Sequence, residues 1–170
     1  AHYIIFAART ADSANPEEGI TLFIVDGKSP GITTYLLRTI AGDKQCELTL
    51  NKVKVPKANI LGQVNHGWGM VKEIISWAAL AKAAEMMGGA QQVLEMTIQY
   101  AKDRVQFDRP IGSFQIIQHY CADMATDVEG SRFSTYQAAW MLSEGLPCTK
   151  EVAIAKAWIG QAHERVATLA

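Results

Sequence analysis

The sequence predicts an α+β fold, in which a β-rich segment precedes an antiparallel helical bundle. Short apolar and β-branched stretches, separated by turn-forming residues, occupy residues 1–62. A glycine-punctuated connection, "LGQVNHGWG", follows. Beyond it, apolar residues recur at the three- and four-residue steps of an amphipathic helix. We therefore expect half of a sandwich- or barrel-like β-domain over residues 1–62 and a helical domain over residues 63–170.

Composition narrows the class of protein. The 170 residues are 49% hydrophobic and 19% charged, which permits a sizeable core and disfavours disorder. The net charge is −1 without a long run of one sign, so a nucleic-acid partner is not expected. No apolar run reaches the roughly 20 residues that span a membrane, and the N-terminus lacks the features of a signal peptide. We expect no membrane partner.

Cysteine and histidine spacing gives no sign of a metal site. Cys46, Cys121 and Cys148 lack CxxC spacing and indicate ordinary thiols in a reducing compartment, either the cytoplasm or, in a eukaryote, the mitochondrial matrix. The histidines are scattered rather than paired at ligand spacing. They are His2, His66, His119 and His163.

Four stretches are predicted strands. They are "HYIIFAAR", "ITLFIVD", "GITTYLL" and "CELTLNKVKVP". The first is continuously apolar, as is typical of a strand buried on both faces. In the fourth, the alternation changes phase after Leu50, so we expect a bulge or tight turn at Asn51–Lys52. Pro56 is expected to end the pairing.

Three helices are predicted after the connection. The first runs from about Trp68 to Lys102, the second from Pro110–Ser113 to about Ser143, and the third follows the break at "EGLP". Gly88–Gly89 weaken the first helix, which indicates close packing against a neighbour. The expected buried positions are Met70, Val71, Ile74, Ile75, Ala78, Ala81, Val93, Leu94, Ile98 and Ala101; Phe114, Ile117, Cys121, Met124 and Val128; and Val152, Ala155, Ile159, Ala162, Val166 and Leu169.

Both ends of the chain lack terminating signals. The first predicted strand begins almost at residue 1, and the third helix reaches "ATLA" without the Gly or Asn that commonly ends a helix. A β part of this size would also bury little surface alone. We therefore expect the chain to be a segment of a larger protein.

The stretch "YAKDRVQFDRPIGSFQ" carries more chemistry than a plain turn between helices needs. Arg104 follows the first helix, where a guanidinium can satisfy terminal carbonyls and the helix dipole. Alternatively, its planar fork can bind phosphate oxygens. Phe107 adds an apolar face and Gln115 an amide, a combination that suits a nucleotide-containing cofactor. The residues alone leave both alternatives open, and GxGxxG, P-loop, GxSxG and HExxH motifs are absent.

The longer stretch "YAKDRVQFDRPIGSFQIIQHYCADM" resembles the same region of the acyl-CoA dehydrogenase family, whose usual form is YAxxRxQFGxPIxxFQxxQxxxADM. Two upstream stretches, "GITLFIVDGKSPGI" and "CELTLNKVKVPKANILGQVNHGWG", resemble the family's middle β-domain and its exit into the helical domain. The resemblance spans essentially the whole chain. It places the chain across the second half of the middle β-domain and most of the C-terminal helical domain.

The resemblance implies a fatty-acid-metabolism flavoprotein that oxidises an acyl-CoA thioester to its 2,3-enoyl form. A carboxylate takes the α-proton, and the flavin of FAD accepts hydride from the β-carbon. Electron-transfer flavoprotein is the usual acceptor, and family members are dimers or tetramers. The resemblance further implies that Arg104 contacts the pyrophosphate of a neighbouring subunit's FAD. Phe107 and Gln115 would line the same region.

The chain also departs from the family pattern. The usual catalytic glutamate is expected beyond residue 170, and the alternative helix position falls near Ala78, which cannot accept a proton. Ser76 and Ala79 stand near the places where many relatives hold acyl-CoA with an aspartate and an arginine. Glu73 and Glu85 are expected to be solvated or to pair along the helix.

Two hypotheses follow from these departures. The chain belongs either to an FAD-dependent acyl-CoA dehydrogenase whose base lies beyond Ala170, or to a non-catalytic, dehydrogenase-like subunit that completes a partner's FAD site. On either hypothesis the 170-residue chain alone is expected to be inactive. The sequence leaves open the length and branching of the acyl group, the electron acceptor, and whether the oligomer contains one kind of subunit or two.

Overall fold

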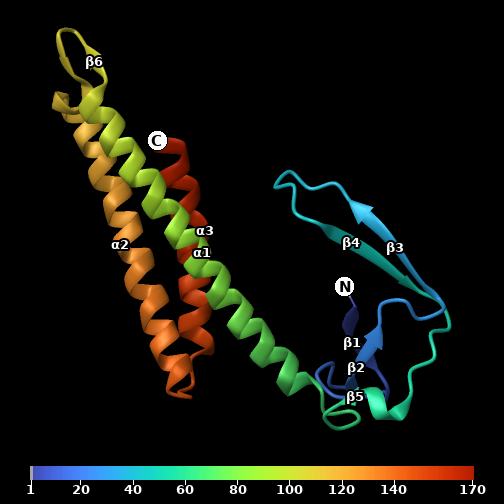
Figure 1. The fold of residues 1–170 in the computed structure, drawn as a ribbon. Coiled ribbons are helices and arrows are strands. Elements are labelled where there is room, and N and C mark those ends of the chain that lie inside the picture. The colour runs from blue at the N-terminus through green and yellow to red at the C-terminus, as the bar shows by residue number, and fades with distance from the viewer. Residues whose placement is uncertain (1) are drawn as a thin grey trace. The chain divides into compact units, whose positions relative to one another are not determined.

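The computed structural model describes residues 2–170 and has the predicted α+β fold (Figure 1). The chain forms two compact units, the first ending at Glu73 and the second spanning Ile74–Ala170. The first unit contains strands β1 (Tyr3–Arg9), β2 (Ile20–Asp26), β3 (Ile32–Leu37), β4 (Gln45–Leu50) and β5 (Ile60–Leu61). Helices α1 (Trp68–Asp103), α2 (Gln115–Ser143) and α3 (Thr149–Leu169) follow, confirming the three predicted helices.

Strand β2 is the centre of a three-stranded antiparallel sheet with the order β1–β2–β5. Leu22 and Val25 of β2 are only 2% and 3% exposed and form the core of this unit. The prediction that the first strand is buried on both faces is wrong, because Tyr3 and Ile5 are 69% and 55% exposed. Strand β1 lies at the edge of the sheet, and one of its faces remains uncovered in residues 2–170.

Strands β3 and β4 form a separate antiparallel hairpin, in which Ile32 pairs with Leu50. The tight turn predicted at Asn51–Lys52 is confirmed, since Lys52 has a φ of 52° and the Asn51 N–H donates to the Gly31 carbonyl at 2.8 Å. The predicted continuation of this strand through Val53–Val55 is wrong. The chain there pairs with no other described strand, because the turn at Lys52 carries it off the ladder.

A polar network fixes the end of the glycine-punctuated connection. The fully buried Thr21 hydroxyl lies 2.6 Å from the Thr10 hydroxyl and accepts the Asn65 N–H at 2.8 Å. Beyond it, Lys72 in the first turns of α1 pairs with Glu17 at 3.2 Å. These contacts explain why the first unit extends to Glu73 rather than to the end of the strands. The domain assignment at residues 1–62 and 63–170 stays a prediction.

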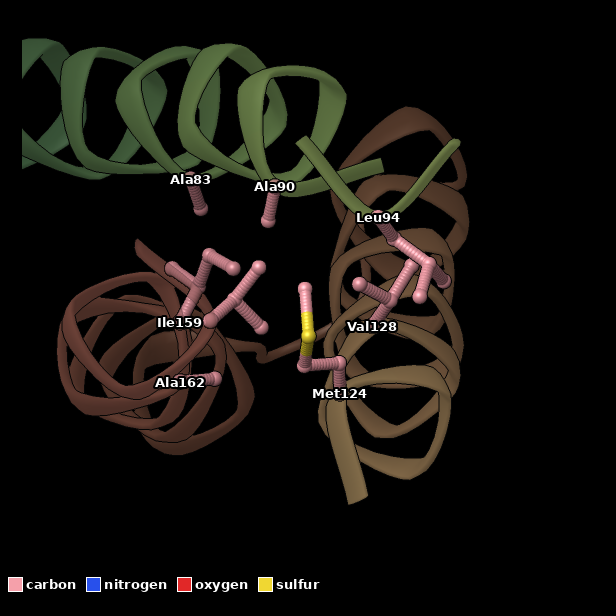
Figure 2. Packing of buried hydrophobic residues seen from close by; sticks show 8 residues of the cluster. Ala83, Ala90, Leu94, Met124, Val128, Ile159 and Ala162 are labelled. Atoms are coloured by element: carbon pink, nitrogen blue, oxygen red, sulfur yellow. The ribbon is translucent and has the colours of Figure 1, made fainter. Parts of the chain in front are cut away.

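The helical unit has two clusters of buried side chains, and all three helices contribute to each of them. Figure 2 shows Met124 of α2 and Ile159 of α3 pointing toward Ala83 and Ala90 on α1. All four side chains are at most 1% exposed. The rest of this cluster is Leu94, Val128, Ala162 and Val166.

The predicted helix faces are right for α3 and partly wrong for α1. All of the predicted α3 positions from Val152 to Val166 are buried. In the first half of α1, however, Ile74 and Ile75 are 52% and 56% exposed. Leu80 and Ala83 are buried there in their place. The apolar residues of this half of α1 occupy more than one face, and the helix offers the less bulky face to α2 and α3.

Helices α2 and α3 are also joined by a polar contact near the core. The Arg165 guanidinium donates to both carboxylate oxygens of Asp127, at 2.8 and 2.5 Å. This hydrogen bonding raises the pKa of Arg165. Trp158 lies against Gly130, where a Cβ atom would stand 3.1 Å from the indole nitrogen. A two-pronged ion pair and a close aromatic contact therefore align these two helices.

Candidate functional site

The turn between α1 and α2 is a small β-hairpin, which the sequence did not predict. Strands β6 (Val105–Gln106) and β7 (Arg109–Pro110) pair across a two-residue turn. Phe107 and Asp108 form this turn with φ angles of 55° and 61°. Positive φ at both central positions is the hallmark of a type I′ turn, which normally takes Asn or Gly. We call residues 104–115 the elbow.

Backbone contacts hold the elbow against the end of α1. The Ile111 N–H donates to the Arg104 carbonyl at 2.8 Å. Gly112 lies so close to α1 that a Cβ atom would stand 3.0 Å from the Ala101 carbonyl oxygen. The Gln118 amide donates to the Gly112 carbonyl at 2.9 Å and ties the elbow to α2. The elbow is therefore a fixed support for its exposed side chains.

Arg104, Phe107 and Gln115, the predicted cofactor-binding residues, are all exposed on the elbow. The Arg104 and Gln115 side chains make no hydrogen bond or ion pair with residues 2–170. The alternative in which the Arg104 guanidinium satisfies helix carbonyls is therefore not observed. Phe107 is 86% exposed, unusually high for a phenylalanine.

The half-buried Phe114 contacts two exposed side chains of the elbow, Arg109 and Phe107. The Arg109 guanidinium lies 4.1 Å from the centre of the Phe114 ring, a cation–π contact. Phe107 meets the same ring edge-on, with ring centres 6.1 Å apart. Sequence reasoning missed this use of Phe114 and Arg109. The signal in the sequence was Asp108 next to Phe107, because Asp is one of the residues that accept the positive φ of a tight turn.

The donor set of the elbow fits an anionic diphosphate attached to a flat ring system. A guanidinium without a protein partner can bind phosphate oxygens with two parallel hydrogen bonds. An exposed aromatic face beside it can pack on the rest of such a ligand. The amide of Gln115 offers both a donor and an acceptor.

The first half of α1 contains no side chain that could act as a base at the position predicted from the family pattern. Ala78 is exposed, and Glu85 instead pairs with Lys82 at 2.8 Å. Ser76 and Ala79 lie together in a groove of about 420 Å³, which Lys156 of α3 also lines. Small side chains therefore stand near the positions at which the family resemblance implies an Asp and an Arg that hold the substrate.

Two other kinds of site were not found. Within residues 2–170, no group of three or more His, Cys, Asp or Glu side chains could hold a metal ion. None of the described helices is long and apolar enough to cross a membrane. The three cysteines are free thiols.

Comparison with known proteins gives the same family along the whole chain. The family model described as "Acyl-CoA dehydrogenase, C-terminal domain" matches residues 65–170. The short/branched chain specific acyl-CoA dehydrogenase of Bos taurus mitochondria is 41% identical over 149 residues, which are 86% of this chain and 34% of the relative. An acyl-CoA dehydrogenase of Bacillus subtilis is 36% identical over 97% of this chain and 44% of its own length.

The structural comparison extends the match to the β-rich unit. The butyryl-CoA dehydrogenase of Megasphaera elsdenii has a TM-score of 0.92 and 34% identity, covering 99% of this chain and 44% of that one. This chain therefore spans less than half the length of these relatives. Sequence, elbow and fold together show that the chain belongs to the acyl-CoA dehydrogenase family.

Proposed function

We propose that the full-length protein is an FAD-dependent acyl-CoA dehydrogenase, which removes hydrogen from the α- and β-carbons of an acyl-CoA thioester to give the 2,3-enoyl-CoA. The observation that carries this proposal is the exposed, unpartnered guanidinium of Arg104 within the elbow of a family member. An unpaired cation held on a fixed support is suited to an anionic ligand.

The elbow is proposed to bind the cofactor of a neighbouring subunit. Arg104 would hold the pyrophosphate of FAD, while Phe107 and Gln115 would line the same region. Bound FAD supplies the hydride acceptor of the reaction. These side chains orient the cofactor and neutralise its charge, but none of them takes part in proton transfer.

The catalytic base is proposed to lie on the chain beyond residue 170. The reaction needs a carboxylate to remove the α-proton, and Ala78 provides no such group. Glu85 is already paired with Lys82 and two helical turns away, about 10 Å along the axis. A glutamate supplied by a later segment is therefore required for activity.

A second candidate is a non-catalytic subunit that completes the FAD site of a partner. Three residues of α1 favour it. Ala78 stands at the alternative position of the catalytic glutamate, and Ser76 and Ala79 stand near the places where many relatives have an aspartate and an arginine that hold acyl-CoA. Both candidates make the same use of the elbow. They differ only in whether the protein itself turns over acyl-CoA.

The partners follow from the relatives. Solved structures with similar chains include one titled as an electron transferring flavoprotein of Acidaminococcus fermentans, and a curated relative is a subunit of a caffeyl-CoA reductase–Etf complex. We propose an electron-transfer flavoprotein as acceptor, a dimer or tetramer as the assembly, and a reducing compartment, in keeping with the free thiols.

Anaerobic mixing of the FAD-loaded, full-length protein with short, branched and long acyl-CoA thioesters tests the function. A dehydrogenase bleaches its flavin absorbance with one of them and yields the enoyl-CoA, detected by mass spectrometry. Flavin that stays oxidised with every thioester would reject the enzyme and leave the non-catalytic subunit. The 170-residue chain alone is expected to be colourless and inactive, and stoichiometric flavin in that preparation would contradict this expectation.

A further inference from the structure

Asp108 places a negative charge at the tip of the elbow. It is the second residue of the hairpin turn, with a φ of 61°, and its side chain is exposed. Its carboxylate makes no hydrogen bond or ion pair with residues 2–170, although Arg109 is its immediate neighbour. Arg109 lies over the Phe114 ring instead. No contact in the described part of the chain therefore accounts for this charge.

Backbone geometry does not require the charge either. Residues at positive φ are most often Gly, and among residues with a Cβ atom Asn and Asp are both enriched there. Asn would adopt the backbone conformation of this turn as readily as Asp and would add no charge. What distinguishes Asp108 from the alternatives is therefore its negative charge.

We propose that Asp108 is an affinity-determining residue of the elbow, which weakens the binding of the FAD diphosphate at Arg104. The inference rests on the proposed cofactor role of the elbow. Arg104 and Arg109 give the elbow two positive charges, and the negative charge of Asp108 lowers its net charge from +2 to +1. A diphosphate bound there is therefore attracted less strongly. The Asp108 side chain is not a contact of the ligand but a repulsive neighbour.

The size of the effect follows from distance and screening. Asp108 and Arg104 are separated by the short β6 strand, so their charges lie on the order of 10 Å apart. Across a protein surface at that distance, one charge acting on a diphosphate changes the affinity by about three- to tenfold. The Debye length is about 10 Å at 0.1 M salt and shorter at higher salt, so the effect decreases as ionic strength rises.

Titration of the full-length apoprotein with FAD, followed by quenching of flavin fluorescence, tests the inference with Asp108→Asn. This substitution keeps the turn-compatible shape and removes the charge. We expect Kd to fall by about three- to tenfold at low ionic strength and the difference to vanish near 0.5 M salt, where screening is complete within a few ångströms. A thermal melt checks that the variant remains folded.

Glu144→Gln is the matched control. Glu144 is exposed, and its substitution removes the same charge as Asp108→Asn. It follows the last residue of α2 and lies about 43 Å from Gln115 along the 29-residue helix. Its Kd for FAD is expected to equal that of the unmodified protein. Equal tightening by both variants would overturn the inference, because the effect would then be one of net charge.

Arg104→Ala in the same titration separates the two proposals. If Arg104→Ala weakens FAD binding while Asp108→Asn leaves it unchanged or also weakens it, the inference about Asp108 is overturned and the cofactor role of the elbow stands. If Arg104→Ala has no effect, the cofactor role itself fails. The inference then fails with it.

Discussion

Phe107 has a backbone conformation that a bulky side chain rarely adopts. Its φ is 55°, and the residue is 86% exposed, so burial in this chain does not compensate for the strain. Such positions cost about 1–3 kcal/mol and cluster at functional sites. The edge-on contact with Phe114 returns about 0.5–1.5 kcal/mol. A ligand contact that uses the Phe107 ring would explain why Asn or Gly does not stand there.

Phe107→Asn separates strain from function. Asn accepts positive φ, so the relieved strain offsets the lost ring contact, and the free energy of unfolding should stay within about 1 kcal/mol of the original. FAD affinity should fall, because the apolar face is removed. Phe114→Ala is the comparison, and it should destabilise more, since Phe114 contacts both Phe107 and Arg109. A loss above about 2 kcal/mol for Phe107→Asn would show a structural role instead.

Thr135 carries a buried hydroxyl without a partner. It lies on α2, is 2% exposed, and its oxygen makes no hydrogen bond with residues 2–170. Thr135→Val replaces this oxygen by a methyl group of similar shape and should stabilise the protein by about 1 kcal/mol, which raises Tm by about 2–4 °C. Thr135→Ala should lower Tm, because it also removes a packed methyl group. Destabilisation by both substitutions would mean that the hydroxyl has a partner in the assembled protein.

At the scale of elements, the two mid-helix glycines of α1 differ in their surroundings. A Cβ atom at Gly89 would stand 3.3 Å from the ring of His163 on α3, whereas at Gly88 it would meet no atom within 4 Å. The prediction of close packing is thus confirmed for Gly89 and wrong for Gly88 among the described residues.

These glycines form a matched pair for substitution. Gly88→Ala should stabilise the protein by about 1 kcal/mol through helix propensity. Gly89→Ala has the same propensity gain but forces His163 to shift, so its gain should be smaller or negative. Thermal unfolding of both variants in the full-length protein is the measurement. Equal gains would show that His163 yields without cost, and a loss at Gly88 would show that another surface packs there.

The helices differ in how far their packing was predictable. In α3, the residues from Val152 to Val166 that recur at steps of three and four are all buried, as predicted, although Ile154 and Trp158 between them are apolar and exposed. In α1, the predicted face included Ile74, Ile75, Ala78 and Ala81, which are exposed, whereas Leu80 and Ala83 are buried. Alanine is small enough to be buried or exposed, so its place is decided by the neighbouring helix.

The elbow hairpin was not predictable because its signals are weak. Its turn contains neither Gly nor Asn, and each of its strands has only two residues. The site residues, in contrast, were named from residue chemistry and family resemblance, which need no knowledge of the turn. The structure places Arg104, Phe107 and Gln115 on one fixed, exposed elbow, which sequence spacing could not establish.

At the scale of the whole molecule, both units carry surfaces that residues 2–170 leave uncovered. The exposed Ile5 of β1, Tyr35 of β3 and Trp77 of α1 lie in different elements and are each more than half exposed. The chain spans less than half the length of its relatives. We therefore propose that catalysis belongs to the assembled full-length protein and that this chain contributes the elbow to its cofactor site.

The most direct test of that account is the Kd of FAD for the full-length protein and its Arg104→Ala variant. Loss of a two-pronged contact between guanidinium and phosphate costs about 1.5–3 kcal/mol, so Kd should rise by about ten- to a hundredfold. Arg104→Lys should fall between the two, and Arg38→Ala, which removes an exposed arginine in the β-rich unit, should leave Kd unchanged. An Arg104→Ala variant that binds FAD as tightly as the original protein would contradict the account.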